Sequence, residues 1–468
     1  MEKSETFDKG YTKRALILFA AFIIIVMYIE TMLVPSLPAI AQQFNINAAE
    51  VSLVVSLYLV SGVALSPIVG KLGDIYGKKR MLNYLLPIYV VSLAFTGFAP
   101  NYLFLIIART IQGIGLTIFP LVVSLIREEF PREEVPRATA IIAAMFGVGS
   151  AIGLPIGSLV SNSFGWQATY HTALPFVLLF AILIMKYARE SKYKRPDAKV
   201  DYIGAIGLAI GLAMVVFGLS EGTSYGWTSP LILTLLIVGA AALVALHFYE
   251  RRLDEPVLNQ RLLRIRNVMS ANLIVLVVGF SFFFSYQAYA YMFESPAPLG
   301  FGLSIFETGL AMLPFALANV IVAPLAGKWI PKTGVKPFFI AGGIVSIVGF
   351  AISALAPDVV ITLIGETLAG LGVVLINVPT INLLVLSIEP KEMGLATSMN
   401  AVFRFLGSTL GAPVSGLFIA QFVSRTAFTY DFYLAIAVTV VGIIVSMSAE
   451  EILGKNKKVQ EIEEKVSV

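Results

Sequence analysis

Four ionisable side chains interrupt long apolar runs of the sequence. They are Glu30, Arg109, Glu366 and Arg404. A charge held away from water is costly unless a partner or a water-filled space receives it. A carboxylate in such a place can take up and release a proton, whereas an arginine keeps its charge and can only pair with, orient or tune other groups. These residue types therefore indicate either proton exchange in a polar interior space or fixed ion pairs between helices.

The segments that carry these residues have the composition and length of membrane-spanning helices. Charged residues make up 13% of the 468 residues, against roughly 25% in soluble domains. Apolar runs of roughly 18–25 residues recur along the chain, and about 20 such residues cross ~30 Å of hydrocarbon. The sequence therefore predicts an all-α membrane protein with fourteen spans, in groups of six, two and six. They are expected near residues 15–37, 51–71, 81–99, 102–125, 138–160, 168–188, 202–220, 230–248, 267–293, 306–327, 338–356, 359–388, 394–422 and 431–449.

Lysine and arginine residues predict how these spans are oriented. Of 33 such residues, 30 lie in every second loop or at the termini, two lie within spans and one, Arg425, lies in an opposite loop. Loops rich in Lys and Arg stay in the cytoplasm, so both termini are expected to be cytoplasmic. We therefore expect a multi-pass protein of the plasma membrane. Because the basic charge alternates with the spans, the sequence gives no indication of a nucleic-acid partner.

The sequence lacks the residue patterns that most enzymes and metal sites need. It contains no cysteine and only two histidines, His171 and His247, which lie too far apart to predict a histidine metal site. It also has no GxxxxGK(S/T) loop to hold ATP phosphates, and no soluble segment large enough for an active site. We therefore expect no enzyme activity and no cofactor, with a proton as the coupling ion.

The chain contains an internal repeat. Residues 66–80, SPIVGKLGDIYGKKR, align with residues 323–337, APLAGKWIPKTGVKP, at a shift of 257 residues. The same shift aligns ARTIQGIG with GETLAGLG, and GVGSAIGLPIG aligns with FLGSTLGAPVS at a shift of 258. Parallel halves of this kind enclose a cavity at the membrane midplane and rock around it. We expect an N-terminal six-helix bundle, a linker with two extra spans, a C-terminal six-helix bundle and a charged cytoplasmic tail, at residues 1–192, 193–262, 263–452 and 453–468.

Several motifs resemble those of the major facilitator superfamily. GKLGDIYGKKR lies between the second and third spans, ARTIQGIG in the fourth and GSAIGLPIG in the fifth. ETMLVPSLP in the first span, the extra pair of spans and NAVFRFLGSTLG resemble the fourteen-spanner drug:proton antiporter branch. The resemblance covers nearly the whole chain and implies a major facilitator fold of two six-helix bundles plus two linker helices. The chain departs from the usual motifs at Glu30, Ile75 and Leu154, where aspartate, a basic residue and proline are common.

The resemblance assigns a conformational latch to the loop after the second span. It implies that Asp74 docks at the start of the span near Gly394, where the helix dipole is positive, and so holds an outward-facing state. Gly70 and Gly77 are interpreted as sites of close backbone approach. The alternative is a plain solvated turn. The expected latch residues are Gly70, Asp74, Gly77, Lys78 and Arg80.

The expected depth of the intramembrane charges indicates a shared pocket. At 1.5 Å per residue, Glu30 lies ~22 Å from the cytoplasmic edge and Arg109 about 10 Å below the outer edge of a ~30 Å core, which is nearly the same depth. We expect Glu30, Arg109 and Glu366 to couple protons, and Arg404 to be a structural charge. The alternative is that Glu30–Arg109 and Glu366–Arg404 are permanent ion pairs.

Small and aromatic residues indicate where helices approach one another and where a substrate is held. A face of small residues in the fifth span, with a proline that kinks or weakens the helix, resembles the antiporter motif. It comprises Gly149, Gly153, Pro155 and Gly157. The aromatic run GFSFFFSYQAYAYMF suits lipophilic cations through cation–π attraction, although such residues also serve ordinary membrane packing. The candidate cavity residues are Gln112, Tyr286, Gln287, Tyr289, Asn377 and Asn400.

Together these features predict a secondary active transporter. We expect it to export amphipathic, cationic drugs or other small lipophilic compounds by alternating access, driven by inward proton flow. One alternative is a proton-coupled symporter or a uniporter of a small metabolite such as an organic acid. Another is a membrane sensor that binds without transport. The expected partners are the lipid bilayer, a small-molecule substrate and protons, and the protein is expected to be a monomer.

Overall fold

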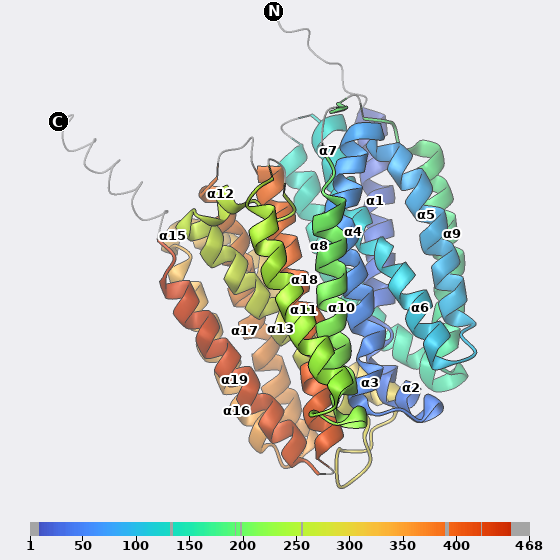
Figure 1. Ribbon diagram of the computed structural model, residues 1–468, viewed down its shortest axis with the longest axis vertical. Helices are drawn as coiled ribbons and strands as arrows, with labels where there is room; N and C mark the ends of the chain where they lie inside the picture. The colour runs from blue at the N-terminus through green and yellow to red at the C-terminus, as the bar shows by residue number, and fades with distance from the viewer. Residues whose placement is uncertain are drawn as a thin grey trace, which may run out of the picture.

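The computed structural model describes residues 9–131, 134–191, 193–196, 199–253, 256–388, 393–422 and 424–450, with a few helical residues described by their backbone alone. All regular elements in these ranges are helical, so the all-α prediction is confirmed. Figure 1 shows them as two bundles of steeply inclined helices with a helix pair against them. The predicted charged tail, 453–468, lies outside the described residues.

The N-terminal helices run from α1 to α9. Their bounds are α1 Lys9–Thr31, η1 Val34–Ser36, α2 Leu37–Phe44, α3 Ala48–Val51, α4 Leu53–Tyr76, α5 Lys78–Gly97, α6 Tyr102–Gln112, η2 Gly113–Thr117, α7 Ile118–Glu129, α8 Val135–Phe164 and α9 Trp166–Tyr187. The predicted fourth span is therefore built from α6, the 3-10 segment η2 and α7. Two glycines allow η2 to lie close to α4 and α5. A Cβ at Gly113 would lie 2.8 Å from the Ser61 Cβ, and one at Gly115 would clash with the Tyr89 ring.

Two linker helices and a short one precede the C-terminal helices. Their bounds are α10 Tyr202–Tyr225, α11 Pro230–Glu250 and α12 Gln260–Leu263. The C-terminal helices are α13 Arg266–Glu294, α14 Ile305–Ala311, α15 Leu313–Thr333, α16 Lys336–Leu355, α17 Val359–Leu386, α18 Met393–Gln421 and α19 Thr426–Met447.

Thirteen helical stretches of the described residues are long and apolar enough to cross a membrane. They correspond to thirteen of the fourteen predicted spans. The remaining prediction, near 81–99, falls on α5, which has Lys78, Lys79 and Arg80 in its first turn and Asn83 shortly after. These polar residues lower the apolar character of α5, so by length and composition the described chain supports thirteen spans.

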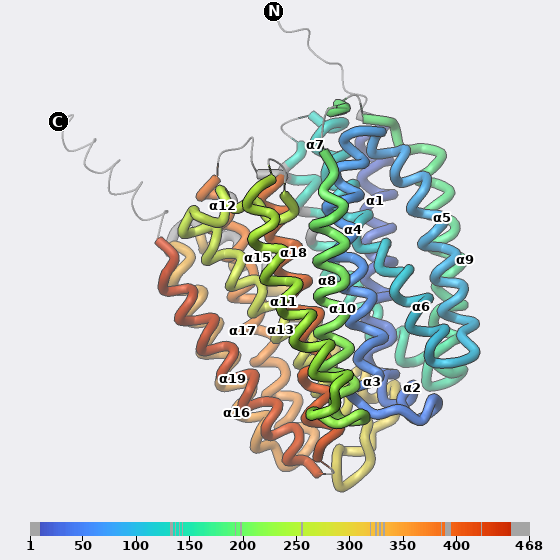
Figure 2. Tube along the Cα trace, viewed as in Figure 1, coloured from blue at the N-terminus to red at the C-terminus, as the bar shows by residue number. Residues whose placement is uncertain are grey.

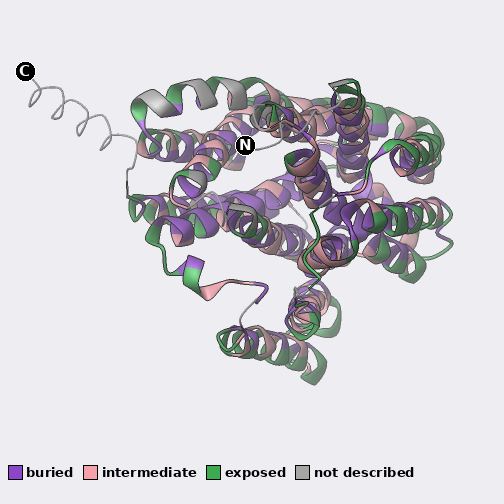
Figure 3. Ribbon diagram, turned by 90° about the horizontal axis from the view of Figure 1, so that it is seen from above, coloured by how far each residue is buried: buried purple, intermediate pink, exposed green. Residues whose placement is uncertain are grey.

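Two seams join the N-terminal helices to the C-terminal helices. Along one seam α4 lies against α18, and along the other α8 lies against α14 and α15. Helix α10 contacts both α4 and α18 and is itself covered by α11, so this hairpin lies over the first seam (Figure 2). Seen from above, buried residues fill the interior and exposed residues follow the rim (Figure 3).

Within each half, one pair of helices packs closely through glycine. Helix α1 packs on α8, and α13 packs on α18, which are the pairs that the internal repeat relates. A Cβ at Gly153 of α8 would lie 2.8 Å from the Tyr28 carbonyl oxygen of α1, and Gly149 and Gly157 face the same helix. A Cβ at Gly411 of α18 would lie 2.5 Å from a carbonyl oxygen of α13. These helices therefore approach to backbone contact, as small-residue faces allow in membranes.

Candidate functional site

Arg109 is fixed inside the N-terminal half. Its side chain is 1% exposed. Nε donates to the Val54 carbonyl oxygen of α4 at 3.1 Å, and Nη1 donates to Oε1 of Gln112 at 3.3 Å. The guanidinium carbon lies 4.3 Å from the centroid of the Tyr58 ring. The positive charge is thus held by carbonyl dipoles and a ring face, which are the partners that a buried guanidinium needs.

Two predicted cavity residues instead join neighbouring helices. The Gln112 side chain is fully buried, and its Oε1 also accepts a hydrogen bond from Thr96 Oγ1 at 3.2 Å, which links α6 to α5. Asn400 donates to Oδ1 of Asn272 at 3.0 Å and to the Ala271 carbonyl oxygen at 3.4 Å. In this conformation the polar groups of both residues are used in packing within one half, and their assignment to a substrate cavity stays a prediction.

Glu30 lies near the end of α1, and its side chain keeps part of its surface exposed. Neither carboxylate oxygen forms a hydrogen bond or an ion pair within 4 Å among the described residues. Two positive charges nonetheless act on it electrostatically, those of Arg109 and Arg404. Arg404 belongs to α18 and so comes from the other half. The permanent Glu30–Arg109 ion pair is therefore not formed in this conformation.

Glu366 is completely buried on α17. Both of its carboxylate oxygens lack a hydrogen-bond partner in the described structure, and the expected Glu366–Arg404 pair is not formed there. The nearby groups that interact with it electrostatically are the hydroxyls of Tyr286 and Tyr289 on α13. Tyr286 also interacts electrostatically with Glu30, so this tyrosine lies near both carboxylates. An ionised carboxylate without a partner is costly in such a place.

The aromatic run of α13 is an internal surface in this conformation. Tyr286, Gln287 and Tyr289 are each at most 2% exposed, so the expected open lining is not seen at these positions. Tyr289 shares a hydrogen bond of 2.8 Å with Ser353 Oγ of α16. Among the predicted cavity residues, Asn377 does keep partial exposure, and its Oδ1 has no partner in the described chain.

A further buried carboxylate escaped the sequence interpretation. Asp431 is fully buried on α19, where Oδ2 accepts a hydrogen bond from Ser415 Oγ at 3.0 Å and Oδ1 has no partner among the described residues. The predicted last span begins at residue 431, which placed this acid at the membrane edge. Because α19 begins at Thr426, Asp431 instead lies more than one turn inside the helix. The sequence signal that could have identified Asp431 is an aspartate followed directly by a long apolar run.

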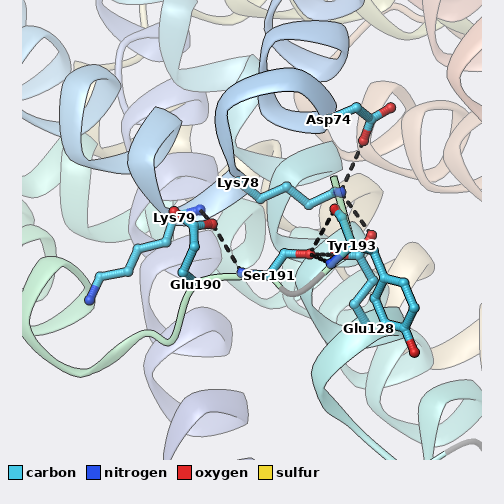
Figure 4. Close-up of polar contacts among 7 residues, drawn as sticks. All are labelled: Asp74, Lys78, Lys79, Glu128, Glu190, Ser191 and Tyr193. Atoms are coloured by element: carbon cyan, nitrogen blue, oxygen red, sulfur yellow. Dashed lines mark hydrogen bonds and ion pairs between the residues drawn. The ribbon is translucent and has the colours of Figure 1, made fainter. Parts of the chain in front are cut away.

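The predicted latch forms a charge network within the N-terminal half. The Lys78 ammonium lies 2.9 Å from Asp74 Oδ1 and 2.7 Å from Glu128 Oε1 of α7 (Figure 4). No bond joins the Asp74 carboxylate to α18 in the described chain, so the docking expected near Gly394 is absent from this conformation. A Cβ at Gly70 would meet nothing within 4 Å, so the close approach expected there is also wrong.

The connection that follows α9 completes this network, and the sequence interpretation missed it. The Glu190 carboxylate accepts the backbone N–H groups of Lys79 and Arg80, each at 3.0 Å, at the start of α5. Ser191 Oγ donates to Glu128, as Figure 4 shows. Gly77 makes room for Glu190: its φ is +114°, and a Cβ there would lie 2.6 Å from the carboxylate. An acid two residues after the predicted span ends gives no local signal for a contact with the start of α5.

Replacing Glu190 with Ala should loosen the start of α5. The variant removes two acceptors from a helix N-terminus, and losing such a cap costs about 1 kcal/mol. We expect faster hydrogen exchange at the amides of the first turn of α5, measured by mass spectrometry on the purified protein. Glu134→Ala, which removes an exposed acid elsewhere on this side, is the control. Unchanged exchange in Glu190→Ala would contradict a capping role.

The two halves touch on the side of the molecule away from this network. The Gln287 Nε2 of α13 donates to the Ala48 carbonyl oxygen of α3 at 2.9 Å. A Cβ at Gly416 of α18 would lie 2.6 Å from the same oxygen, and one at Gly309 of α14 would lie 2.7 Å from the Leu154 carbonyl oxygen of α8. Both seams are therefore in close contact at the end opposite the basic loops.

A family model establishes what kind of protein has this architecture. The Major Facilitator Superfamily model matches residues 18–202 and 273–465, well over half of the chain. The chain belongs to the Major Facilitator Superfamily. This confirms the predicted superfamily, and the two matched segments leave out most of the α10–α11 linker. The protein is thus a transporter of the plasma membrane with many spans, rather than an enzyme.

Relatives of this superfamily member include multidrug resistance proteins. It is 28% identical over 372 residues to multidrug resistance protein 3 of Bacillus subtilis, which covers 78% of the chain and 71% of the relative. It is 26% identical over 395 residues to multidrug resistance protein Stp of Mycobacterium tuberculosis, which covers 84% of the chain and 73% of the relative.

Solved structures of superfamily transporters share the fold. A bacterial homologue of the human lysosomal transporter Spinster, in an inward-facing and unoccupied conformation, matches with a TM-score of 0.68 at 14% identity, over 94% of the chain and 98% of that structure. The partially occluded inward-open xylose transporter XylE from E. coli matches with a TM-score of 0.63 at 14% identity, over 95% and 99%. At this identity the likeness concerns the fold alone.

Proposed function

We propose that this transporter exports amphipathic compounds that carry a cationic group, in exchange for protons that enter the cell. In this proposal it belongs to the fourteen-spanner drug:proton antiporters, has both termini in the cytoplasm, works as a monomer and needs no cofactor beyond the proton. The two relatives described above are multidrug resistance proteins, and this supports the proposed substrate class.

The observation that carries the proposal is the state of Glu30. It is a partly exposed carboxylate that lacks a bonded partner among the described residues, and it lies where charges from both halves act on it. A proton and a cationic substrate each neutralise such a group, and neither can do so while the other occupies it. Mutually exclusive binding at one carboxylate is sufficient to exchange the two across a membrane when the halves alternate their access.

The contacts of the two halves supply the conformational part of the proposal. The halves touch at the end opposite the basic loops, while Asp74 pairs with Lys78 rather than with α18. With the basic loops in the cytoplasm, this is an inward-facing arrangement. In the outward-facing state Asp74 would dock on the start of α18, and Glu366 would serve as a second proton-binding group in the C-terminal half.

The direction of coupling can be tested in inverted membrane vesicles. An antiporter takes a cationic dye into the lumen when the lumen is acidic, because protons leaving the lumen drive the dye inward. A proton symporter takes up its substrate when the gradient is reversed, and a uniporter responds equally to both. We expect uptake of the dye only with an acidic lumen, measured by fluorescence quenching. Dye that binds the purified protein without any uptake under either gradient would instead indicate a sensor.

A further inference from the structure

Two opposite charges from different halves interact electrostatically without forming an ion pair. Glu30 of α1 and Arg404 of α18 interact electrostatically, and both side chains keep part of their surface exposed. They form no ion pair within 4 Å among the described residues. The Arg404 Nε–H is buried and has no acceptor in the described chain. A carboxylate and a guanidinium that attract each other without a bond between them can each still bind a group of a third molecule.

The two arginines near Glu30 differ in how many of their side-chain donors already form hydrogen bonds. Arg109 is 1% exposed and donates to Val54 and Gln112 from two of its nitrogens. Arg404 is partly exposed, and its backbone rather than its side chain is bonded: its carbonyl oxygen accepts from Ser408 Oγ at 2.9 Å. That bond lies within α18, so it leaves the guanidinium available to an incoming acceptor.

An aromatic wall adjoins these charges. Tyr286 of α13 interacts electrostatically with Glu30. The ring of Phe282, which is partly exposed, stacks on Tyr286 with centroids 4.4 Å apart, and the Phe315 ring meets Tyr286 edge-on at 5.3 Å. Phe282, backed by these two buried rings, offers the partly exposed apolar contact that suits the flat part of an amphipathic compound. The polar end of that compound would then reach the two charges.

We propose that Glu30 and Arg404 together bind the polar end of a zwitterionic substrate, with its cationic group at Glu30 and its anionic group at Arg404. The inference rests on the proposed export function and narrows its substrate class. A purely cationic compound is attracted by Glu30 and repelled by Arg404, whereas a zwitterion satisfies both charges. A guanidinium also holds a carboxylate through two parallel hydrogen bonds. Arg404 thereby sets specificity, in place of the structural role that the sequence suggested.

A pair of matched dyes tests this assignment. Rhodamine B is zwitterionic at neutral pH, and its ethyl ester carries the same rings with a cation alone. In Arg404→Gln we expect the affinity of the purified protein for rhodamine B to fall about tenfold. Affinity for the ester should rise about threefold, because the repelling charge is gone. Fluorescence anisotropy measures both, and the ratio of the two affinities does not depend on the fraction of folded protein.

Two further variants separate specificity from structure. Arg404→Lys keeps the charge and should retain most of the affinity for rhodamine B, whereas Arg404→Met, of similar volume, should behave as Arg404→Gln does. Arg425→Gln is the matched control, since Arg425 lies on the Phe301 ring and donates to the Pro357 carbonyl oxygen, away from the two charges. Its dye ratio should equal that of the unaltered protein.

The outcomes distinguish this inference from the proposed function. If Arg404→Gln weakens both dyes equally, or changes neither, Arg404 does not set specificity. If the unaltered protein binds the ester and refuses rhodamine B, the zwitterion assignment fails while cation export stands. If it binds neither dye, both the assignment and the proposed substrate class are contradicted.

Discussion

Glu30→Gln is expected to abolish dye uptake driven by an acidic lumen in inverted vesicles, down to the level of vesicles that lack the protein. Glutamine keeps the size and most of the polarity of the side chain but cannot exchange a proton. Glu30 has no bonded partner in the described chain, so its replacement breaks no contact there, and the fold should survive. A thermal unfolding curve close to that of the unaltered protein would show this.

Glu134→Gln provides the control for this result, because Glu134 is exposed and lies next to the first turn of α8 on the side of the basic loops. It should transport normally. Undiminished uptake in Glu30→Gln would remove Glu30 from the coupling step. Glu366 and Asp431, both completely buried, would then be the candidates, and Glu366→Gln and Asp431→Asn would identify which of them titrates.

Gly153→Ala adds only a methyl group, but we expect it to lower the stability of the protein strongly. The added Cβ would lie 2.8 Å from the Tyr28 carbonyl oxygen, and backbone atoms of two packed helices cannot move aside as a flexible side chain can. Overpacking of this kind costs about 1–3 kcal/mol. Because Glu30 follows Tyr28 on α1, the shift should also impair transport. Thermal unfolding and vesicle uptake, measured on the same preparation, test both effects.

Gly207→Ala is the matched substitution. Gly207 also lies inside a helix, α10, but its Cβ would meet Leu246 at 3.5 Å, which is an ordinary contact distance. Since alanine is the better helix former by up to about 1 kcal/mol, this variant should be as stable as the unaltered protein or more so. If the two variants lost stability equally, the close contact between α1 and α8 would not be the cause.

Much of the fold could be predicted because the bilayer simplifies the problem. Long apolar runs must be helical in lipid, so composition alone located thirteen of the spans. The internal repeat also related the loop after α4 to the loop after α15, and α8 to α18. Helix α5 was less certain because its start is basic and polar. The break of the fourth span into α6, η2 and α7 was not predicted, since a local change of helix type depends on what the glycines of η2 meet.

The candidate site was predicted less completely, and the reasons are specific. The intramembrane charges were identified by their cost, but not which of them interact. Arg404 acts on Glu30 across the two halves, and sequence spacing contains no information about that distance. Gln112 was assigned to a cavity because it shares a helix face and a motif with Arg109, although its bonds to Arg109 and Thr96 lie inside one half. Glu190 was missed because its partners are backbone N–H groups, which no sequence motif marks.

The α10–α11 hairpin gives the transporter two unlike flanks. Helix α10 touches α4 of one half and α18 of the other, so any rotation of the halves against each other must shear along its surface. Helices α10 and α11 separate the contact between α4 and α18 from the acyl chains of the bilayer. No linker helix packs on α8 or α15 in the described chain. An amphiphile dissolved in the membrane therefore meets one flank covered by the linker hairpin and another flank, along α8 and α15, that the hairpin does not cover.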